Sequence, residues 1–144
     1  MKLHVILLAA AILCTSATAM CINKKPRLKN TRWKSEYEEF VADAGTSKVT
    51  VTLDFISSNK FELKHESKMP PYPSMYAKAD GTVDMNPGFS TEYTIKGTYS
   101  IDKEGVTIKS ESGETHTLLF MSGKLISGSL THRPLEFTRE GKLK

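Results

Sequence analysis

The stretch that decides the fold is KVTVTLDFIS, residues 48–57, in which apolar and polar residues alternate strictly. The apolar positions are Val49, Val51, Leu53 and Phe55. Side chains of a β-strand point alternately to the two faces of the sheet, so this pattern is typical of a strand with one buried face. We therefore predict a strand here whose apolar face points into a core.

The same alternation continues towards the C-terminus. Six further segments show it: KFELKHES (60–67), TEYTIKGTYSI (91–101), VTIKSE (106–111), ETHTLLFM (114–121), KLISGSL (124–130) and LEFTRE (135–140). Turn-forming residues separate them, as in DKEG (102–105) and MSGK (121–124). Gly97 and Gly128 lie inside predicted strands and are expected bend points of a curved sheet.

The segment WKSEYEEFVADAG, residues 33–45, fits two structures. As a helix it has a capping box formed by Ser35 and Glu38, and Gly45 would end it. As a strand it places Trp33 and Tyr37 on one face. We predict the strand, because the short connections around it favour a hairpin with residues 48–57.

Eight short strands in sequence order either leave exposed edges or close into a barrel, and closure removes the edges. We therefore predict an all-β fold, an eight-stranded antiparallel up-and-down meander barrel over residues 31–140. The alternative is an open sandwich of two sheets.

Closure gives Trp33 a structural role. If the first strand pairs with the last, Trp33 lies beside LEFTRE, where Leu135, Phe137 and Arg139 share the inward face. A guanidinium over an indole contributes about 0.5–2 kcal/mol. We expect Trp33 to fill the closed end of the barrel in contact with Arg139.

At these residues the chain resembles the lipocalin-like (calycin) barrels, and in particular the small secreted lipocalin-like domains of bacteria. The resemblance lies in the tryptophan that begins the first strand, in Gly97-Thr98-Tyr99, and in Phe137-Thr138-Arg139 near the end. It implies a lipocalin-like barrel from Trp33 to Arg139.

The N-terminus has the features of an export signal. Residues 1–19 combine one lysine, an apolar run and the small residues Ala17 and Ala19, so cleavage is expected after Ala19. We predict a periplasmic or secreted protein. Cys21 then remains as a free thiol, or alternatively as a lipid anchor. The basic arm 20–30 and the tail 141–144 are predicted to be solvated ends.

Most functional classes find no support in the sequence. The net charge of +4 comes largely from the two ends, and no basic face interleaved with aromatics suggests nucleic-acid binding. No nucleophile elbow, metal-ligand spacing or cofactor motif indicates an enzyme, so we expect no catalytic residues, no metal and no cofactor. His65, His116 and His132 lack zinc-ligand spacing. We expect a monomer without a transmembrane span.

The open end of the predicted barrel mixes aromatic and polar residues, as small-ligand sites do. The candidate ligand-binding residues are Tyr37, His65, Tyr93 and His116 on strands and Tyr72, Met75 and Tyr76 on a long connection. A barrel of this size either encloses a small cavity or is filled by its own side chains. Both remain open from the sequence.

The connection MPPYPSMYAKADGTVDMNPGF, residues 69–89, interrupts the meander at the open end. Connections this long are usually functional or disordered. Its methionines and tyrosines suit an apolar lid, but we favour a surface insertion with a short extra strand over a lid.

Two functions follow as hypotheses. The first is a non-enzymatic exported barrel that binds a small apolar or amphipathic ligand at its open end. The second is a cell-envelope interaction or inhibitor protein whose packed barrel presents its loops to a partner.

Overall fold

The computed structural model describes residues 25–144, and every regular element in this range is a β-strand. The predicted signal peptide, its cleavage site and Cys21 lie outside the described residues. The ten strands are β1 (Thr31–Val41), β2 (Gly45–Phe55), β3 (Lys60–Met69), β4 (Tyr72–Ala77), β5 (Val83–Asn86), β6 (Phe89–Ile101), β7 (Val106–Ser110), β8 (Thr115–Met121), β9 (Lys124–Ser127) and β10 (Leu135–Lys142).

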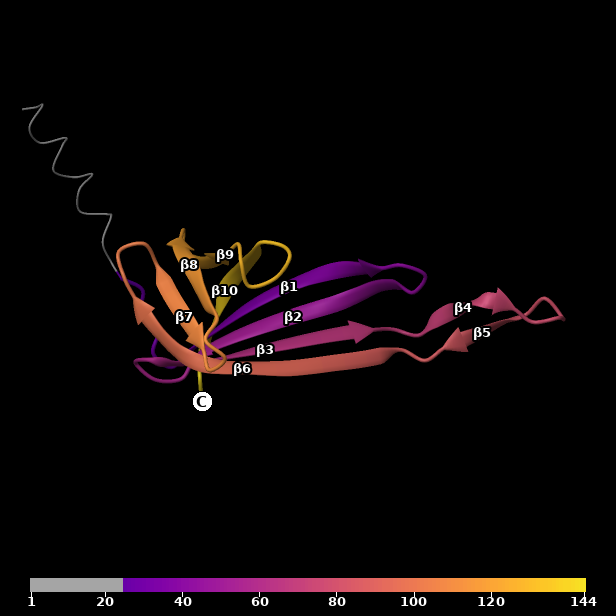
Figure 1. Ribbon diagram of the computed structural model, residues 1–144, viewed down its shortest axis with the longest axis horizontal. Helices are drawn as coiled ribbons and strands as arrows, with labels where there is room; N and C mark the ends of the chain where they lie inside the picture. Colours follow the sequence, from indigo (N-terminus) through magenta and orange to yellow (C-terminus); the bar gives the residue numbers. More distant parts are fainter. Residues whose placement is uncertain (1–24) are drawn as a thin grey trace, which may run out of the picture.

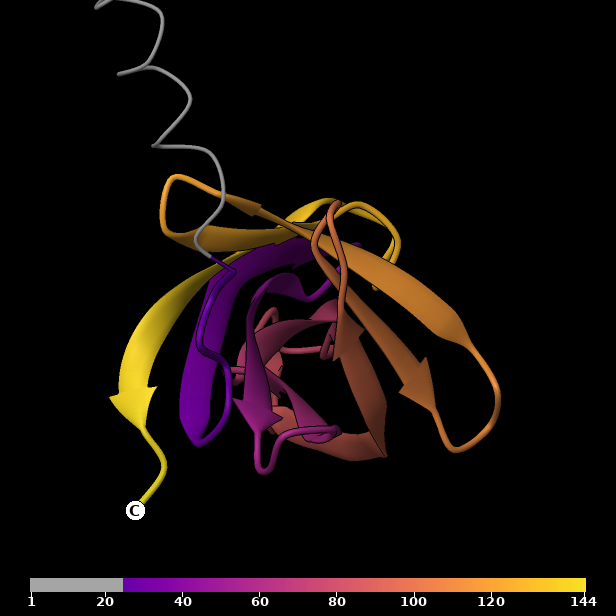
Figure 2. The ribbon, with the colours of Figure 1, turned by 90° about the vertical axis from the view of Figure 1, so that its left-hand side faces the viewer.

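Eight of these strands form a closed antiparallel barrel in the order β1-β10-β9-β8-β7-β6-β3-β2. Figure 2 looks along this barrel from one end, and the strands form a ring. The predicted meander barrel is therefore confirmed, and the open sandwich is wrong. Closure occurs where the first strand meets the last, with Thr31 opposite Lys142 and Lys34 opposite Thr138.

The ambiguous first segment is a strand, as predicted. β1 pairs with β2 along its full length, from Thr31 opposite Phe55 to Val41 opposite Gly45. This hairpin supplies hydrogen-bond partners along one whole edge of β1. If the segment were a helix, the facing edge of β2 would lack these partners.

The predicted inward residues form the core. Val49, Val51, Leu53 and Phe55 are at most 1% exposed. They pack with buried side chains from the other barrel strands, namely Phe61, Leu63, Tyr99, Val106, Ile108, Leu118, Leu125, Leu135 and Phe137. The core thus follows the period-two pattern of the sequence.

Trp33 lies in this core at one end of the barrel, which we call the closed end. Its indole is 3% exposed, and its Nε1 donates a hydrogen bond to Thr31 Oγ1 at 2.9 Å. Leu28 is 1% exposed and belongs to the same core cluster. The expectation that the whole arm 20–30 is solvated is therefore wrong for Leu28, because this apolar side chain helps to fill the closed end.

The predicted cation–π contact between Arg139 and Trp33 is wrong. Arg139 is the register neighbour of Trp33, as closure required, but its side chain is exposed. A β-bulge lies at this point of the β1–β10 pair, and bulges bend and twist a strand locally. Among residues 25–144 the cation–π contact that forms joins Arg133 to Tyr37 instead.

Strand β10 continues two residues beyond the predicted end of the domain, to Lys142. Lys142 pairs with Thr31, and Leu143 N donates a hydrogen bond to Asn30 O at 3.0 Å. Lys142 and Leu143 were predicted to belong to a solvated tail. Their backbone is instead held by Thr31 and Asn30.

Gly97, predicted to be a bend point, lies where two neighbouring strands approach each other closely. It lies between Phe61 of β3 and Ser110 of β7, and a Cβ atom built on it would lie 2.0 Å from Lys109 O. Only glycine allows this close approach of β6 and β7. Gly128, the second predicted bend point, lies just beyond the end of β9 at Ser127.

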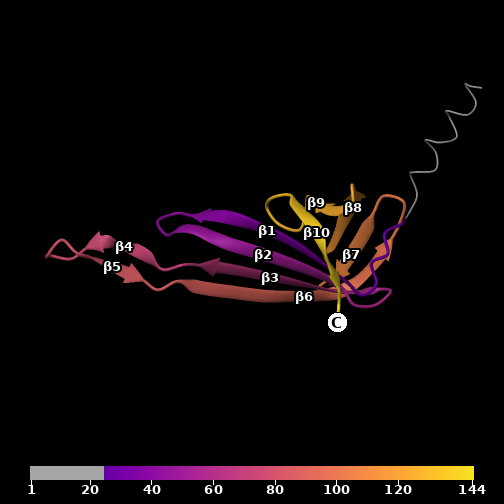
Figure 3. The ribbon, with the colours of Figure 1, turned by 180° about the vertical axis from the view of Figure 1, so that it is seen from behind.

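The barrel strands differ strongly in length. β1 and β2 have 11 residues each, β3 has 10 and β6 has 13, whereas β7, β8, β9 and β10 have 5, 7, 4 and 8. The four long strands therefore run past the short ones at the end away from Trp33, which we call the mouth (Figures 1 and 3). There one side of the barrel is missing.

The long connection 69–89 is a hairpin that projects from this extension. β4 and β5 pair only with each other, as a separate two-stranded sheet. The structure thus agrees with an insertion that carries short extra strands. These strands are hard to detect in the sequence, because Pro73 lies inside β4 and β5 has only four residues.

Candidate functional site

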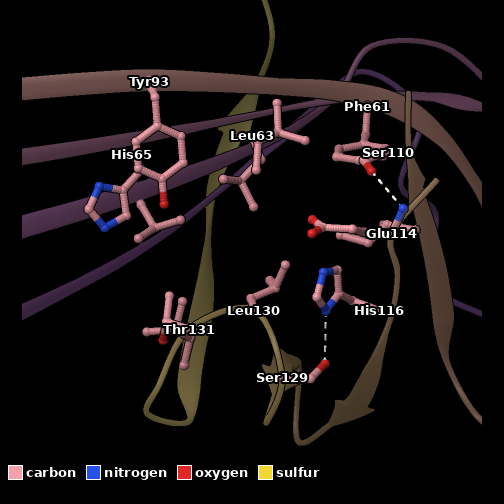
Figure 4. A pocket seen from close by; sticks show the side chains of 14 residues that line it. Phe61, Leu63, His65, Tyr93, Ser110, Glu114, His116, Ser129, Leu130 and Thr131 are labelled. Atoms are coloured by element: carbon pink, nitrogen blue, oxygen red, sulfur yellow. Dashed lines mark hydrogen bonds between the residues drawn. The ribbon is translucent and has the colours of Figure 1, made fainter. Parts of the chain in front are cut away.

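A cavity of about 260 Å³ lies in the barrel interior on the side of the mouth. Its apolar wall consists of core and near-core residues, namely Val51, Phe61, Leu63, Ile95, Ile108, Leu130 and Leu135. Its polar lining consists of His65, Tyr93, Ser110, Glu114, His116, Ser129 and Thr131. Figure 4 shows the polar side chains gathered around an apolar centre. The closed end is packed and the mouth end is hollow.

His65 and Tyr93 form one wall of the cavity. They are register neighbours on β3 and β6, and their rings stack with centroids 4.7 Å apart and an interplanar angle of 11°. Burial lowers the pKa of His65 and raises the pKa of Tyr93, because it disfavours the charged form of each group. The two side chains offer the cavity an imidazole and a phenol.

The opposite wall comes from the β7–β8 hairpin. His116 of β8 lies with Nδ1 3.1 Å from Ser129 Oγ. The turn before it is fixed by Ser110, whose Oγ accepts a hydrogen bond from Glu114 N at 3.0 Å and lies 2.7 Å from Ser112 Oγ. In Figure 4 the Glu114 carboxylate points from this turn towards the centre of the cavity.

The loop 128–134, between β9 and β10, covers part of the cavity and contributes Ser129, Leu130 and Thr131. Its C-terminal half is fastened to β1. The Arg133 guanidinium lies 4.7 Å from the centre of the Tyr37 ring, and its Nη1 donates a hydrogen bond to Glu38 O at 3.0 Å. His132 Nε2 lies 3.1 Å from a carboxylate oxygen of Glu39.

The structure brings together three of the seven predicted ligand-binding residues. His65, Tyr93 and His116 line the cavity. Tyr37 does not line the cavity. Its ring contacts Arg133, which holds the covering loop 128–134. Tyr72, Met75 and Tyr76 lie on β4, in the projecting hairpin, and do not line the cavity. The segment that covers part of the cavity is 128–134, and the connection 69–89, for which a lid was the less favoured interpretation, does not line it.

Sequence reasoning missed the other polar residues of the cavity. Ser110 and Glu114 belong to a tight turn, and Ser129 and Thr131 belong to an irregular loop. Turns are polar in most proteins, so their composition gave no signal. Strands β7, β8 and β9 are short. The connections that follow β7 and β9 therefore line the same cavity as His65.

Outside the cavity, charged side chains of the barrel strands form surface ion pairs. Glu36 pairs with Lys34 at 3.0 Å on the outer face of the barrel. The described chain, residues 25–144, contains no group of three His, Cys, Asp or Glu side chains arranged to hold a metal ion. Nor does this part of the chain include a helix with the length and apolar character needed to cross a membrane.

The chain was compared with models of known protein families, with curated proteins and with solved structures, and none of them matches it. The closed eight-stranded barrel, compatible with a lipocalin-like fold, and the lined cavity at its mouth are therefore the basis for functional inference.

Proposed function

We propose that this protein is an exported, non-enzymatic, lipocalin-like barrel that binds a small amphipathic molecule in the cavity at its mouth. The proposal rests on the division of the cavity lining into apolar and polar residues. Seven apolar residues form the wall, and seven polar residues converge on the same space from four separate parts of the chain. Pockets of mostly apolar wall with a few convergent polar groups are the usual form of small-ligand sites.

The size of the cavity limits the ligand. A water molecule takes up roughly 30 Å³ in the liquid, so 260 Å³ corresponds to roughly nine waters. This volume lies just below the usual range for drug-sized ligands. The proposed ligand is therefore compact, such as one ring with a short polar arm, and not a long acyl chain.

The test is binding of a neutral compact probe, 2-phenylethanol, measured by saturation-transfer NMR on the purified mature protein. Native mass spectrometry of protein isolated without denaturation would reveal a ligand retained from the cell. The variant Thr131→Trp places a large ring in the cavity and should abolish binding. The matched control is Thr98→Trp, which adds the same ring on the exposed outer face of β6. Absence of any bound probe or retained ligand in the wild type would contradict the proposal.

A second function is favoured by a different observation, the projecting hairpin. β4 and β5 expose several large apolar side chains to solvent, namely Met75 (67%), Tyr76 (83%), Val83 (48%) and Met85 (62%). An isolated two-stranded hairpin is marginally stable, and apolar patches on it suit a partner surface. Because Lys78, Asp80 and Asp84 lie around its tip, the partner proposed is a folded protein of the cell envelope and not the lipid interior.

This second function is tested with a photoactivatable cross-linking residue at position 76 in exporting cells. One discrete adduct should form, it should contain a single envelope protein, and Met85→Asp should abolish it. The same cross-linking residue at position 98, on the barrel, is the control. Equal cross-linking from positions 76 and 98 would show that the hairpin has no specific partner.

A further inference from the structure

The charges of the residues that line the cavity indicate which class of ligand fits it. This inference rests on the proposed function. Of the fourteen described residues that line the cavity, none is a lysine or an arginine, and one, Glu114, is acidic. Burial lowers the pKa of His65, which disfavours a positive charge there. Glu114 thus contributes a carboxylate to a space without a lining lysine or arginine to pair with it.

The position of Glu114 makes this carboxylate available to a ligand. Its backbone N–H is tied to Ser110 Oγ at 3.0 Å, which fixes the turn, while its side chain points into the cavity (Figure 4). Glu114 forms no ion pair with another described residue. Most charged side chains of the barrel strands near the mouth are paired instead, as Lys64 is with Glu92 at 3.1 Å.

The surroundings of Glu114 offer further partners to a cation. The Ser129 and Thr131 hydroxyls and the Tyr93 phenol supply oxygens that accept hydrogen bonds, and an ammonium group has three donors to give. The Tyr93 and Phe61 rings supply aromatic faces, which attract cations. A carboxylate ligand would meet Glu114 without a lining lysine or arginine to offset the repulsion.

We propose that the ligand of this cavity is a compact organic amine, with its ammonium group against Glu114 and its apolar body against Leu63, Ile108 and Leu135. The preference is opposite to that of the chain as a whole, whose net charge of +4 attracts anions. A selectivity for amines would therefore come from the cavity and not from the general field of the protein.

The experiment compares three probes of similar size, namely 2-phenylethylamine, 2-phenylethanol and phenylacetate, by calorimetry on the full mature chain. We expect the wild type to bind the amine at least about tenfold more tightly than the other two, as one added charge pair allows. Glu114→Gln should remove this preference. Glu114→Lys should reverse it in favour of phenylacetate.

The control is Glu111→Gln, which neutralises an exposed carboxylate on the same turn that does not line the cavity. This variant should keep the preference for the amine. Loss of that preference in Glu111→Gln would overturn the assignment to Glu114. Equal binding of the three probes by the wild type would overturn the amine inference while the proposed ligand-binding function stands. Failure of all three to bind would contradict the proposed function itself.

Discussion

The indole of Trp33 packs edge-on against Phe120, with ring centroids 6.3 Å apart and an interplanar angle of 83°. Edge-to-face geometry is a preferred arrangement of aromatic pairs. Phe120 comes from the last part of β8 and is 37% exposed, so it covers Trp33 from the side of the closed end. The closed end is therefore sealed by aromatic packing and by Leu28, and Arg139 takes no part in the seal.

Replacing Trp33 with alanine should lower the free energy of unfolding by about 3–5 kcal/mol, because it leaves a large cavity in the core. Arg139→Ala is the matched control at the register neighbour. It should change stability by less than about 0.5 kcal/mol, as is usual for exposed residues. Chemical denaturation measures both. Equal effects of the two substitutions would show that the arginine is part of the seal after all.

The substitution Gly97→Ala should destabilise the barrel by about 1–3 kcal/mol, the usual cost of overpacking. The added Cβ would lie 2.0 Å from Lys109 O and 2.8 Å from Phe61, so the backbone of β7 must move. Gly128→Ala, where nothing lies within 4 Å, should be close to neutral. Thermal unfolding of the two variants provides the measurement, and a neutral Gly97→Ala would contradict the close approach of β6 and β7.

The stability of the protein should fall as the pH drops below the ordinary histidine value of 6.5, in part because of His65. Burial lowers the pKa of His65 in the folded state, while Glu39 opposes this shift. The unfolded chain therefore takes up the proton first, and stability present at neutral pH is lost as the pH falls through the folded pKa. His65→Phe keeps an aromatic ring on Tyr93 and should reduce this pH dependence.

The comparison uses urea unfolding at pH 7 and pH 5. Tyr93→Phe is the control, since it keeps the stacked ring and leaves His65 in place. It should retain the pH dependence of the wild type. An unchanged slope in His65→Phe would mean that other groups account for the loss of stability.

Arg133→Ala should loosen the loop 128–134 without unfolding the barrel. The substitution removes the contact with Tyr37 and the hydrogen bond to Glu38 O. A cation–π contact at an exposed site contributes about 0.5–1 kcal/mol, so the global effect should be small. Hydrogen exchange detected by mass spectrometry should show faster exchange in peptides spanning 128–134. Exchange rates equal to those of the Arg139→Ala control would exclude a fastening role for Arg133.

Replacement of residues 73–84 by a short Gly-Ser link should leave the thermal midpoint nearly unchanged. The hairpin strands pair only with each other, so the barrel keeps every ladder. The hairpin does not line the cavity, and this variant should therefore still bind the compact probes while losing the cross-linked partner. A loss of probe binding would restore the hairpin as a lid.

The sequence by itself determined the strands, because burial of one face imposes an alternation that can be counted along the chain. Residues 48–57, Trp33 and the closure between β1 and β10 could all be predicted in this way. It also indicated the end of the barrel where the cavity lies, since the strand directions placed His65, Tyr93 and His116, which line the cavity, near the mouth.

Only the tertiary structure decided how far each strand pairs. The short strands β7, β8 and β9 stop below the mouth, and this brings the Glu114 turn and the loop 128–134 against a sheet that is distant in sequence. The register shift at the β1–β10 closure, which leaves Glu140 without a partner on β1, could not be predicted from the alternation. Strand ends and bulges depend on which neighbour supplies the next hydrogen bond, and that neighbour lies far along the chain, where no local pattern records it.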